Sequence, residues 1–408
     1  MTTTTAKFRA GHATHPDWRM ACDLALAQIN GQAINSGVSS EATLGFVYLT
    51  EGLGNSSANI LDLLRERTGI NDWVGAVGMG ICASGAEYIN EPAIAIMLSD
   101  IAPANYQIYS GRKRAPQLSQ RTGSGATLSH TALIHADPGT GDVQELINDM
   151  ADRTETGFLF GGITSGKATA GQIALDDVSG GAMSGGISGV VFSSDVKLMT
   201  RITQGCSPLG KEHTVSAAQG NYLKSLDESP ALDVMLKDLG VDEAKRQSRD
   251  GREILRLIGE SPLQKGLLIG VAPKGSDLGG KPMGFGDYVV RHLVGIDPIN
   301  RIVAVGDHIQ PDDRAVFCTR DAQAARRDLI RICAELRDEA EESNLMIQGA
   351  LYFSCVARGP NTFGDTGAEL AIIKHNLGDV PLVGFYANGE IARNKLYGYT
   401  GVLTLFVK

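Results

Sequence analysis

The sequence predicts an α/β fold of mixed sheets, built from repeated strand–helix–strand units and divided into two modules. A short apolar strand, a loop, an amphipathic helix and a second apolar strand follow one another three times along the chain. Each copy ends in a segment of the form Gly-x-x-[Ala/Thr]-[Ser/Asn]-Gly. A crossover of this length normally joins parallel strands, and 408 residues are comfortable for two hydrophobic cores.

The first copy runs from Leu44 to Glu87. Its apolar strands are predicted at residues 45–49 and 74–79, and apolar residues at helical spacing predict a helix between them. The second strand leads into the first glycine segment, residues 80–85. We expect this segment to be a loop whose backbone N–H groups face a ligand.

The second copy occupies residues 132–166 and ends in the glycine segment 161–166. The third copy occupies residues 349–390 and ends in the glycine segment 384–389, with Glu390 next. Because the ends of parallel strands meet at one edge of a sheet, the three segments are predicted to line one polar pocket. None of them fits a dinucleotide fingerprint or a phosphate-binding loop, which argues against a nucleotide ligand.

Composition and charge exclude several classes of protein. The net charge is −9 and aromatic residues make up 6%, so neither phosphate binding nor base stacking on nucleic acid is expected. No apolar run is long enough to span a bilayer, and the polar N-terminus does not resemble a signal peptide, so a cytoplasmic location is expected. The six cysteines lack metal-binding or redox spacing and are read as free thiols.

With these segments in place the chain resembles the FIST family of bacterial sensory domains over nearly its whole length. The resemblance rests on six segments: Gly80–Glu87, Phe158–Gly162, Gln204–Gly210, Val289–Arg291, Phe353–Arg358 and Val383–Ile391. It implies a signal-transduction protein that binds a small ligand, with amino acids as one suggested class. One departure is Ala86, which separates Gly85 from Glu87 where relatives read Gly-Glu directly.

The resemblance also implies an arrangement of modules and a ligand cleft. A FIST N-like module is expected at residues 1–229, with repeats one and two, and a FIST C-like module at residues 230–408, with repeat three. No output domain remains, so signalling would require a separate partner such as a kinase or cyclase. The ligand is expected between the modules, at residues drawn from the repeated segments and the best-matched strands: Cys82, Ser84, Gly85, Glu87, Thr164, Ser165, Gly166, Arg291, Cys355, Arg358, Tyr386, Asn388, Gly389 and Glu390.

Three charged positions carry most of the predicted chemistry. Arg358, after a strand, can clamp a carboxylate with two parallel hydrogen bonds, although a surface ion pair is the alternative. Glu87 and Glu390 can receive an amine, although helix capping or pairing with an arginine is the alternative. Together they suit a zwitterion such as an amino acid. Arg291 is expected on a strand, where pairing with Asp287 competes with a ligand role.

Two other functions remain open from the sequence. Some relatives resemble heme-dependent nitric-oxide sensors, and His213 and His292 lie in matching segments, so they are the candidate axial ligands. Cys82 or Cys355 could serve an enzyme acting on a small metabolite, with Glu87 or Glu390 beside it. No sequence pattern supplies a base for either thiol, which favours a binding protein over an enzyme. No site for a metal ion outside heme is predicted.

Overall fold

The computed structural model describes residues 8–36, 41–111, 113–166, 171–176, 180–260, 266–274 and 288–408, in two compact units. Unit 1 combines residues 1–203 and 329–408, and unit 2 is residues 204–328. The predicted module boundary at 229–230 lies inside unit 2 as the contacts define it. All three repeats therefore belong to unit 1, whereas the strand that carries Arg291 belongs to unit 2.

Each repeat contains the predicted pair of parallel strands joined by helix. The pairings β2–β3, β8–β9 and β22–β23 are all parallel, which confirms the crossover prediction. The elements of the three crossovers are β2 (Leu44–Thr50), α2 (Glu51–Gly54), α3 (Ser57–Thr68) and β3 (Asp72–Gly78); β8 (Thr131–Ala136), α4 (Val143–Asp152) and β9 (Leu159–Ile163); β22 (Ile347–Cys355), α9 (Pro360–Phe363), α10 (Ala368–Leu377) and β23 (Leu382–Ala387).

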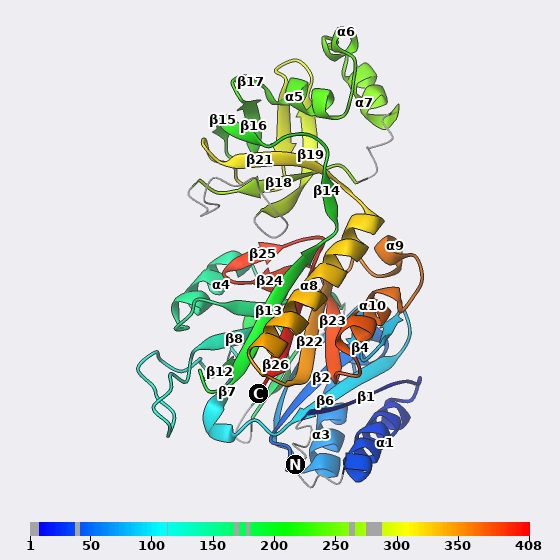
Figure 1. The fold of residues 1–408 in the computed structure, drawn as a ribbon, viewed down its shortest axis with the longest axis vertical. Helices are drawn as coiled ribbons and strands as arrows, with labels where there is room; N and C mark the ends of the chain where they lie inside the picture. The colour runs from blue at the N-terminus through cyan, green and yellow to red at the C-terminus, as the bar shows by residue number, and fades with distance from the viewer. Residues whose placement is uncertain are drawn as a thin grey trace. The chain divides into compact units, whose positions relative to one another are not determined.

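Each parallel pair lies inside a six-stranded sheet of the described chain, and the three sheets share one plan (Figure 1). Sheet 1 has the order β1-β6-β2-β3-β10-β11, sheet 2 the order β7-β12-β8-β9-β24-β25, and sheet 3 the order β13-β26-β22-β23-β4-β5. The remaining bounds are β1 (Phe8–Thr14), β4 (Gly80–Ala83), β5 (Ala86–Ile89), β6 (Ala93–Ser99), β7 (Tyr106–Tyr109), β10 (Gln172–Leu175), β11 (Gly180–Met183), β12 (Ile187–Phe192), β13 (Lys197–Gln204), β24 (Glu390–Ala392), β25 (Lys395–Tyr397) and β26 (Thr400–Val407).

The hairpins that follow the parallel pairs are exchanged between repeats in a cycle. Hairpin β4–β5 follows repeat 1 but completes sheet 3 through β23. Hairpin β10–β11 follows repeat 2 but completes sheet 1 through β3, and hairpin β24–β25 follows repeat 3 but completes sheet 2 through β9. This arrangement relates the three repeats by pseudo-threefold symmetry and ties each sheet to the next.

One glycine occupies the same place in the second parallel strand of every repeat. Gly75, Gly161 and Gly384 pair with Val47, Ile134 and Tyr352. A Cβ atom at any of the three would lie 1.7–1.9 Å from the carbonyl oxygen of its partner, a distance that no side chain permits. Only glycine therefore fits, and this requirement is one source of the repeated sequence pattern.

This register corrects the alignment of the first repeat. The equivalent of segments 161–166 and 384–389 is 75–80, not 80–85, because Gly75 pairs as Gly161 and Gly384 do. The predicted loops are also partly strand: residues 80–83 form β4, 161–163 end β9 and 384–387 end β23. Glycine spacing alone could not distinguish a close strand approach from a turn.

Equivalent residues of the three repeats meet at the centre of unit 1. Tyr48, His135 and Phe353 each follow the residue that pairs with the repeated glycine. Their rings lie 5.5–6.2 Å apart between centroids, and the Tyr48 hydroxyl lies 3.1 Å from Nε2 of His135. The pseudo-threefold axis therefore passes through this aromatic contact.

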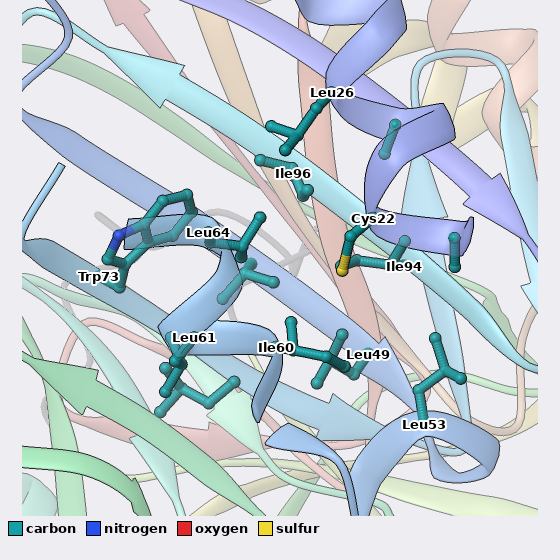
Figure 2. Packing of buried hydrophobic residues seen from close by; sticks show 14 of the residues in the cluster. Cys22, Leu26, Leu49, Leu53, Ile60, Leu61, Leu64, Trp73, Ile94 and Ile96 are labelled. Carbon is teal, nitrogen blue, oxygen red and sulfur yellow. The ribbon is translucent and has the colours of Figure 1, made fainter. Parts of the chain in front are cut away.

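Helices α1 (Trp18–Ser36) and α3 cover sheet 1 and form its hydrophobic core, shown in Figure 2. Trp73 of β3 lies in this core with its indole N–H donating to the Ile70 carbonyl at 2.9 Å. Helix α1 also protects the edge of the sheet, because the side-chain amides of Gln28 and Gln32 bond the backbone of His12 and Ala10 in β1. Polar groups of an edge strand are thereby satisfied.

Unit 2 is inserted between β13 and α8 (Ala322–Glu342) of the third repeat. Its antiparallel ladder closes on itself in the described residues, because β21 pairs with both β15 and β18. Helices α5 (Ala231–Asp238), α6 (Glu243–Arg246) and α7 (Gly251–Glu260) accompany the strands β14 (Cys206–Pro208), β15 (His213–Gln219), β16 (Tyr222–Leu226), β17 (Ser229–Pro230), β18 (Leu268–Ala272), β19 (Val289–Asp297), β20 (Ile302–Val305) and β21 (Arg314–Arg320). None of the helices in the described ranges is long and apolar enough to cross a membrane.

Candidate functional site

A group of buried polar side chains lies where sheet 3 meets helix α10 and the exchanged hairpins. We call it the charge cluster. It contains six predicted site residues and four others: Cys82, Glu87, Cys355, Arg358, Tyr386 and Glu390, with Tyr352, Ser354, Glu369 and Thr400.

The ion pair between Arg358 and Glu369 anchors the cluster. Nε of Arg358 donates to Oε1 of Glu369 at 2.8 Å, and the two side chains are 1% and 0% exposed. Glu369 lies in the first turn of α10, where the helix dipole favours a negative charge. Hydroxyl groups of Tyr352 and Ser354 also donate to this carboxylate, at 2.6 and 3.1 Å. The buried carboxylate is therefore well compensated.

Glu390 lies in β24 and is fully buried. Its Oε2 atom accepts hydrogen bonds from the Thr400 hydroxyl at 2.7 Å and the Thr400 N–H at 3.1 Å. Burial nevertheless raises the pKa of Glu390 to about 8, because these bonds, the charge of Arg358 and the Cys355 thiol compensate only in part. Near neutral pH this carboxyl group is mostly protonated.

Glu87 lies in β5, directly across the hairpin from Cys82 of β4. Its carboxyl oxygens accept from the Tyr386 hydroxyl and the Gly367 N–H. Burial raises the pKa of Glu87 to about 7; the Gly367 bond opposes this shift and the Glu369 carboxylate adds to it. The charge cluster therefore holds two carboxyl groups that can change ionisation near neutral pH.

The two cysteines of the cluster are poor nucleophiles in this setting. Burial raises the pKa of Cys355 to about 12 and that of Cys82 well above its usual value, and neighbouring glutamates add to both shifts. The thiols are thus protonated at neutral pH, whereas a nucleophilic cysteine requires a lowered pKa. The geometry gives no support to a cysteine-dependent enzyme.

Three polar atoms of the cluster are buried without a hydrogen bond to the described residues: Nη1 and Nη2 of Arg358 and Oε1 of Glu390. Nη2 nevertheless lies 2.8 Å from Oε1 of Glu369 in the ion pair. Buried polar atoms are nearly always bonded, so Nη1 and the Glu390 oxygen each have room for a partner such as water or a ligand. A molecule with a carboxylate and an ammonium group would satisfy both of these atoms.

The other predicted residues of unit 1 lie elsewhere, at the junction where the repeats join. Backbone bonds link Gly166 to Val77 and Asn388 to Ile163, and the Ile163 N–H donates to the Gly389 carbonyl at 2.8 Å. The Ser165 hydroxyl donates to the Tyr386 carbonyl and accepts from the Met79 N–H. These contacts hold the repeats together, and Asn388 is the exposed member of the set.

Thr164 lies at the same junction, and its buried Oγ1 has no hydrogen-bond partner among the described residues. Ser84 and Gly85 form the turn between β4 and β5, with Gly85 at φ 74°. The Ser84 hydroxyl bonds the backbone of Val380 and Leu382 at the start of β23. Ser84 and Gly85 thus shape the hairpin and attach it to β23.

Arg291 lies in β19 of unit 2, outside the charge cluster. Its Nε donates to Oδ2 of Asp307 at 2.6 Å. The competing partner Asp287 falls outside the described residues. The sequence thus predicted an ion pair of Arg291 as one of two alternatives, and the observed partner is a different aspartate.

The two candidate heme ligands do not fit an axial role in the described residues. His213 has both ring nitrogens engaged, with Asp227 and Asp238 each at 2.9 Å. His292 is exposed on β19, whereas heme requires an apolar pocket around its ligand. The described residues also contain no group of three side chains suited to a metal ion.

Four members of the cluster escaped the sequence prediction. Tyr352 and Ser354 alternate on β22, so both point from one face of the sheet toward Glu369. That alternation of polar residues in a buried strand was a readable signal. Glu369 was not singled out, because nothing local in the sequence marks a glutamate of a first helical turn as buried, and no local pattern marks Thr400.

The comparisons with known proteins identify the family of the chain. The chain matches the FIST N domain over residues 43–229 and the FIST C domain over residues 231–393. It therefore belongs to the FIST family, whose domains serve sensory functions in signal transduction and are associated with small-ligand binding. The charge cluster contains residues from both matched ranges.

Relatives of full length occur in mycobacteria. The chain is 29% identical over 413 residues to the uncharacterized protein Rv0628c of Mycobacterium tuberculosis, covering 97% of this chain and 98% of the relative. It is also 29% identical over 424 residues to the uncharacterized protein Mb0898c of Mycobacterium bovis, with the same coverage. Similarity along almost the whole of each chain indicates a shared two-domain organisation.

Proposed function

We propose that this protein is a sensor that binds an amino acid or a related zwitterionic metabolite at the charge cluster. The observation that carries the proposal is that Nη1 of Arg358 and Oε1 of Glu390 are buried and have neither a hydrogen bond nor an ion pair to the described residues. A ligand carboxylate would accept from Nη1, and a ligand ammonium group would donate to Oε1. Glu87 offers a second carboxyl group for the ammonium.

Ligand binding would change the ionisation of the cluster. Glu390 has a pKa of about 8 and is largely protonated at pH 7 before a cation binds. Glu87 has a pKa of about 7 and is half-protonated at that pH. An ammonium group nearby would lower both pKa values and ionise the carboxyl groups. The two carboxyl groups are therefore only partly ionised before the ligand binds and become fully ionised when its ammonium group compensates them.

The segment 359–367 offers a way to connect binding to a response. Gly359 and Gly367 have φ values of 55° and 84°, which glycine adopts without strain. Their N–H groups donate to Glu369 and Glu87, so each end of the segment is held by a carboxylate of the cluster. A ligand that changes the charge of Glu87 would alter this attachment. We propose that the segment opens to admit the ligand and that its position forms the signal.

A thermal-shift screen tests the proposal directly. The wild-type protein is expected to be stabilised by a subset of amino acids, by several degrees at concentrations well above Kd. Glu390→Gln should reduce this shift without abolishing it, since an amide cannot compensate an ammonium group and Glu87 alone remains to do so. Asp149→Asn, which alters an exposed ion pair on α4, is the matched control and should respond as wild type does. A wild-type protein that responds to no amino acid would remove the proposal's main support.

A further inference from the structure

A cavity lies in unit 1, away from the charge cluster, between the edge strand β13 and the starts of β8 and β9. It has a volume of about 480 Å³, within the range typical of small-molecule sites. Phe158, Leu198, Leu345 and Val407 supply apolar surface, and Lys197 lies at the rim. The pseudo-threefold symmetry allows this cavity to be compared with its two counterparts.

The first counterpart lies between repeats 1 and 2, and a tyrosine fills it. Tyr106 begins the edge strand β7 and pairs with Phe192. Its hydroxyl donates to the Thr43 carbonyl at 2.9 Å and to the Asp72 carboxylate at 2.7 Å, at the starts of β2 and β3. An aromatic ring with a polar end therefore occupies this place in the fold.

The second counterpart lies between repeats 3 and 1, and a phenylalanine ring lies at its wall. Phe8 begins the edge strand β1 and pairs with Ser99, at the position equivalent to Phe192. The Phe8 ring packs so closely on Gly349, at the start of repeat 3, that a Cβ atom there would lie 2.5 Å from it. The chain thus supplies an aromatic ring at two of the three equivalent positions, although a cavity of about 400 Å³ still adjoins Phe8.

The third place holds Leu198, and here the ring is missing. The hydroxyls of Thr200 and Thr404 are 2.9 Å apart, which indicates the register of β13 against β26. In that register Leu198 lies opposite Phe406, the equivalent of Phe192 and Ser99. The leucine side chain is shorter than phenylalanine or tyrosine, and the cavity lies beside it.

The charges at the rim favour an anion. Glu339 is paired with Arg201 at 2.6 Å, and His130 is paired with Glu155 at 2.7 Å. No described residue forms an ion pair with Lys197, whose side chain is exposed. Its ammonium group is therefore available to a negatively charged ligand.

We propose that this cavity binds a small aromatic carboxylate. The ring of the ligand occupies the place that Tyr106 and Phe8 take in the other two repeats, and its carboxylate pairs with Lys197. This site is independent of the charge cluster and of the ligand proposed there.

Fluorescence titration of the full-length protein with 1-naphthoate tests the inference. Leu198→Phe and Leu198→Tyr place a ring where the equivalent positions have one. Because this ring would fill the cavity, each variant should bind naphthoate more weakly by at least about tenfold. Leu255→Phe makes the same change at an exposed position of unit 2 and should bind as wild type does. Glu390→Gln should also leave naphthoate binding unchanged.

The charge is tested separately with Lys197→Gln. It should weaken naphthoate by about fivefold, the worth of one exposed ion pair, and leave the neutral 1-naphthamide unaffected. Because Lys197 is exposed, this variant reports on the site even if the leucine variants fold poorly. Wild-type protein that does not bind naphthoate up to millimolar concentrations would overturn the inference, and so would equal binding by wild type and a folded Leu198→Phe variant.

Discussion

Arg358 and Glu369 form an ion pair that is removed from water on both sides, with Nε and Oε1 2.8 Å apart and side-chain exposures of 1% and 0%. The guanidinium carbon also lies 5.1 Å from the centre of the Phe363 ring, so an aromatic face covers it. Such a pair is costly to bury and more costly to break.

Breaking one side of this pair should destabilise unit 1 strongly. Glu369→Gln leaves Arg358 charged and uncompensated, and we expect a loss of about 3–5 kcal/mol. Urea unfolding followed by tryptophan fluorescence reports on unit 1, because Trp18 and Trp73 both lie there. Asp149→Asn breaks an exposed pair in the same unit and should cost less than about 1 kcal/mol. Equal costs for the two variants would contradict the account.

Stability should fall as pH rises because of Glu390. Its folded pKa is about 8, above the ordinary value of 4.5, so the folded state holds a proton that the unfolded state has lost. The loss of stability begins at about pH 4.5, the unfolded pKa, and is complete above the folded pKa. Between these two pKa values the free energy of unfolding falls by about 1.4 kcal/mol for each pH unit. Between pH 6.5 and 8.5, Glu390→Gln should therefore lose less stability than wild type in urea unfolding; parallel profiles would show that Glu390 ionises normally.

His135 should make the protein sensitive to acid. Burial lowers the pKa of His135 to about 3, and its Nδ1 has no hydrogen-bond partner in the described residues. Unfolding lets the imidazole take up a proton below pH 6.5, which costs about 2 kcal/mol of stability at pH 5. His135→Phe copies Phe353 at the equivalent position, so it should fold and lose less stability between pH 7.5 and 5. A variant with the wild-type acid profile would assign the acid sensitivity to other groups.

The glycine of each second parallel strand should resist even a methyl group. Gly384→Ala would place Cβ 1.7 Å from the Tyr352 carbonyl oxygen, which forces the strands of sheet 3 apart. We expect a loss above about 3 kcal/mol or failure to fold. At Gly141 no atom lies within 4 Å of the added carbon, so Gly141→Ala should be nearly neutral. A comparison of soluble yield and melting temperature decides, and a stable Gly384→Ala would disprove the packing argument.

The sequence predicted the local units but not their exchange. The repeats around residues 44–87, 132–166 and 349–390 were identified from apolar periodicity, and their parallel pairing is confirmed. Which sheet each hairpin completes depends on contacts between distant segments, such as Phe385 with Ile81, and no local pattern encodes it. The same limit explains the wrong register of the first repeat: segment 80–85 matches the glycine pattern, but Gly80 pairs with Ile89 of β5 and not with a parallel strand.

The sequence predicted some residues of the charge cluster and missed others, and both results have a physical reason. Arg358 was proposed because binding residues gather in loops at strand ends, and Glu87 and Glu390 were proposed because they follow the repeated glycine segments. Glu369 was missed because a glutamate in the first turn of a helix is usually solvated. Its burial follows only from the fold, which brings Tyr352 and Arg358 to it.

Proton release on ligand binding tests the central claim most directly. The amino acid that gives the largest thermal shift is titrated into the protein by calorimetry at pH 7, in two buffers of different ionisation enthalpy. With pKa values of about 8 for Glu390 and about 7 for Glu87, binding of an ammonium group that ionises both should release about 1.4 protons from wild type and about 0.5 from Glu390→Gln. Binding without proton release, or with the same release from Glu390→Gln, would contradict the assignment of the charge cluster as the ligand site.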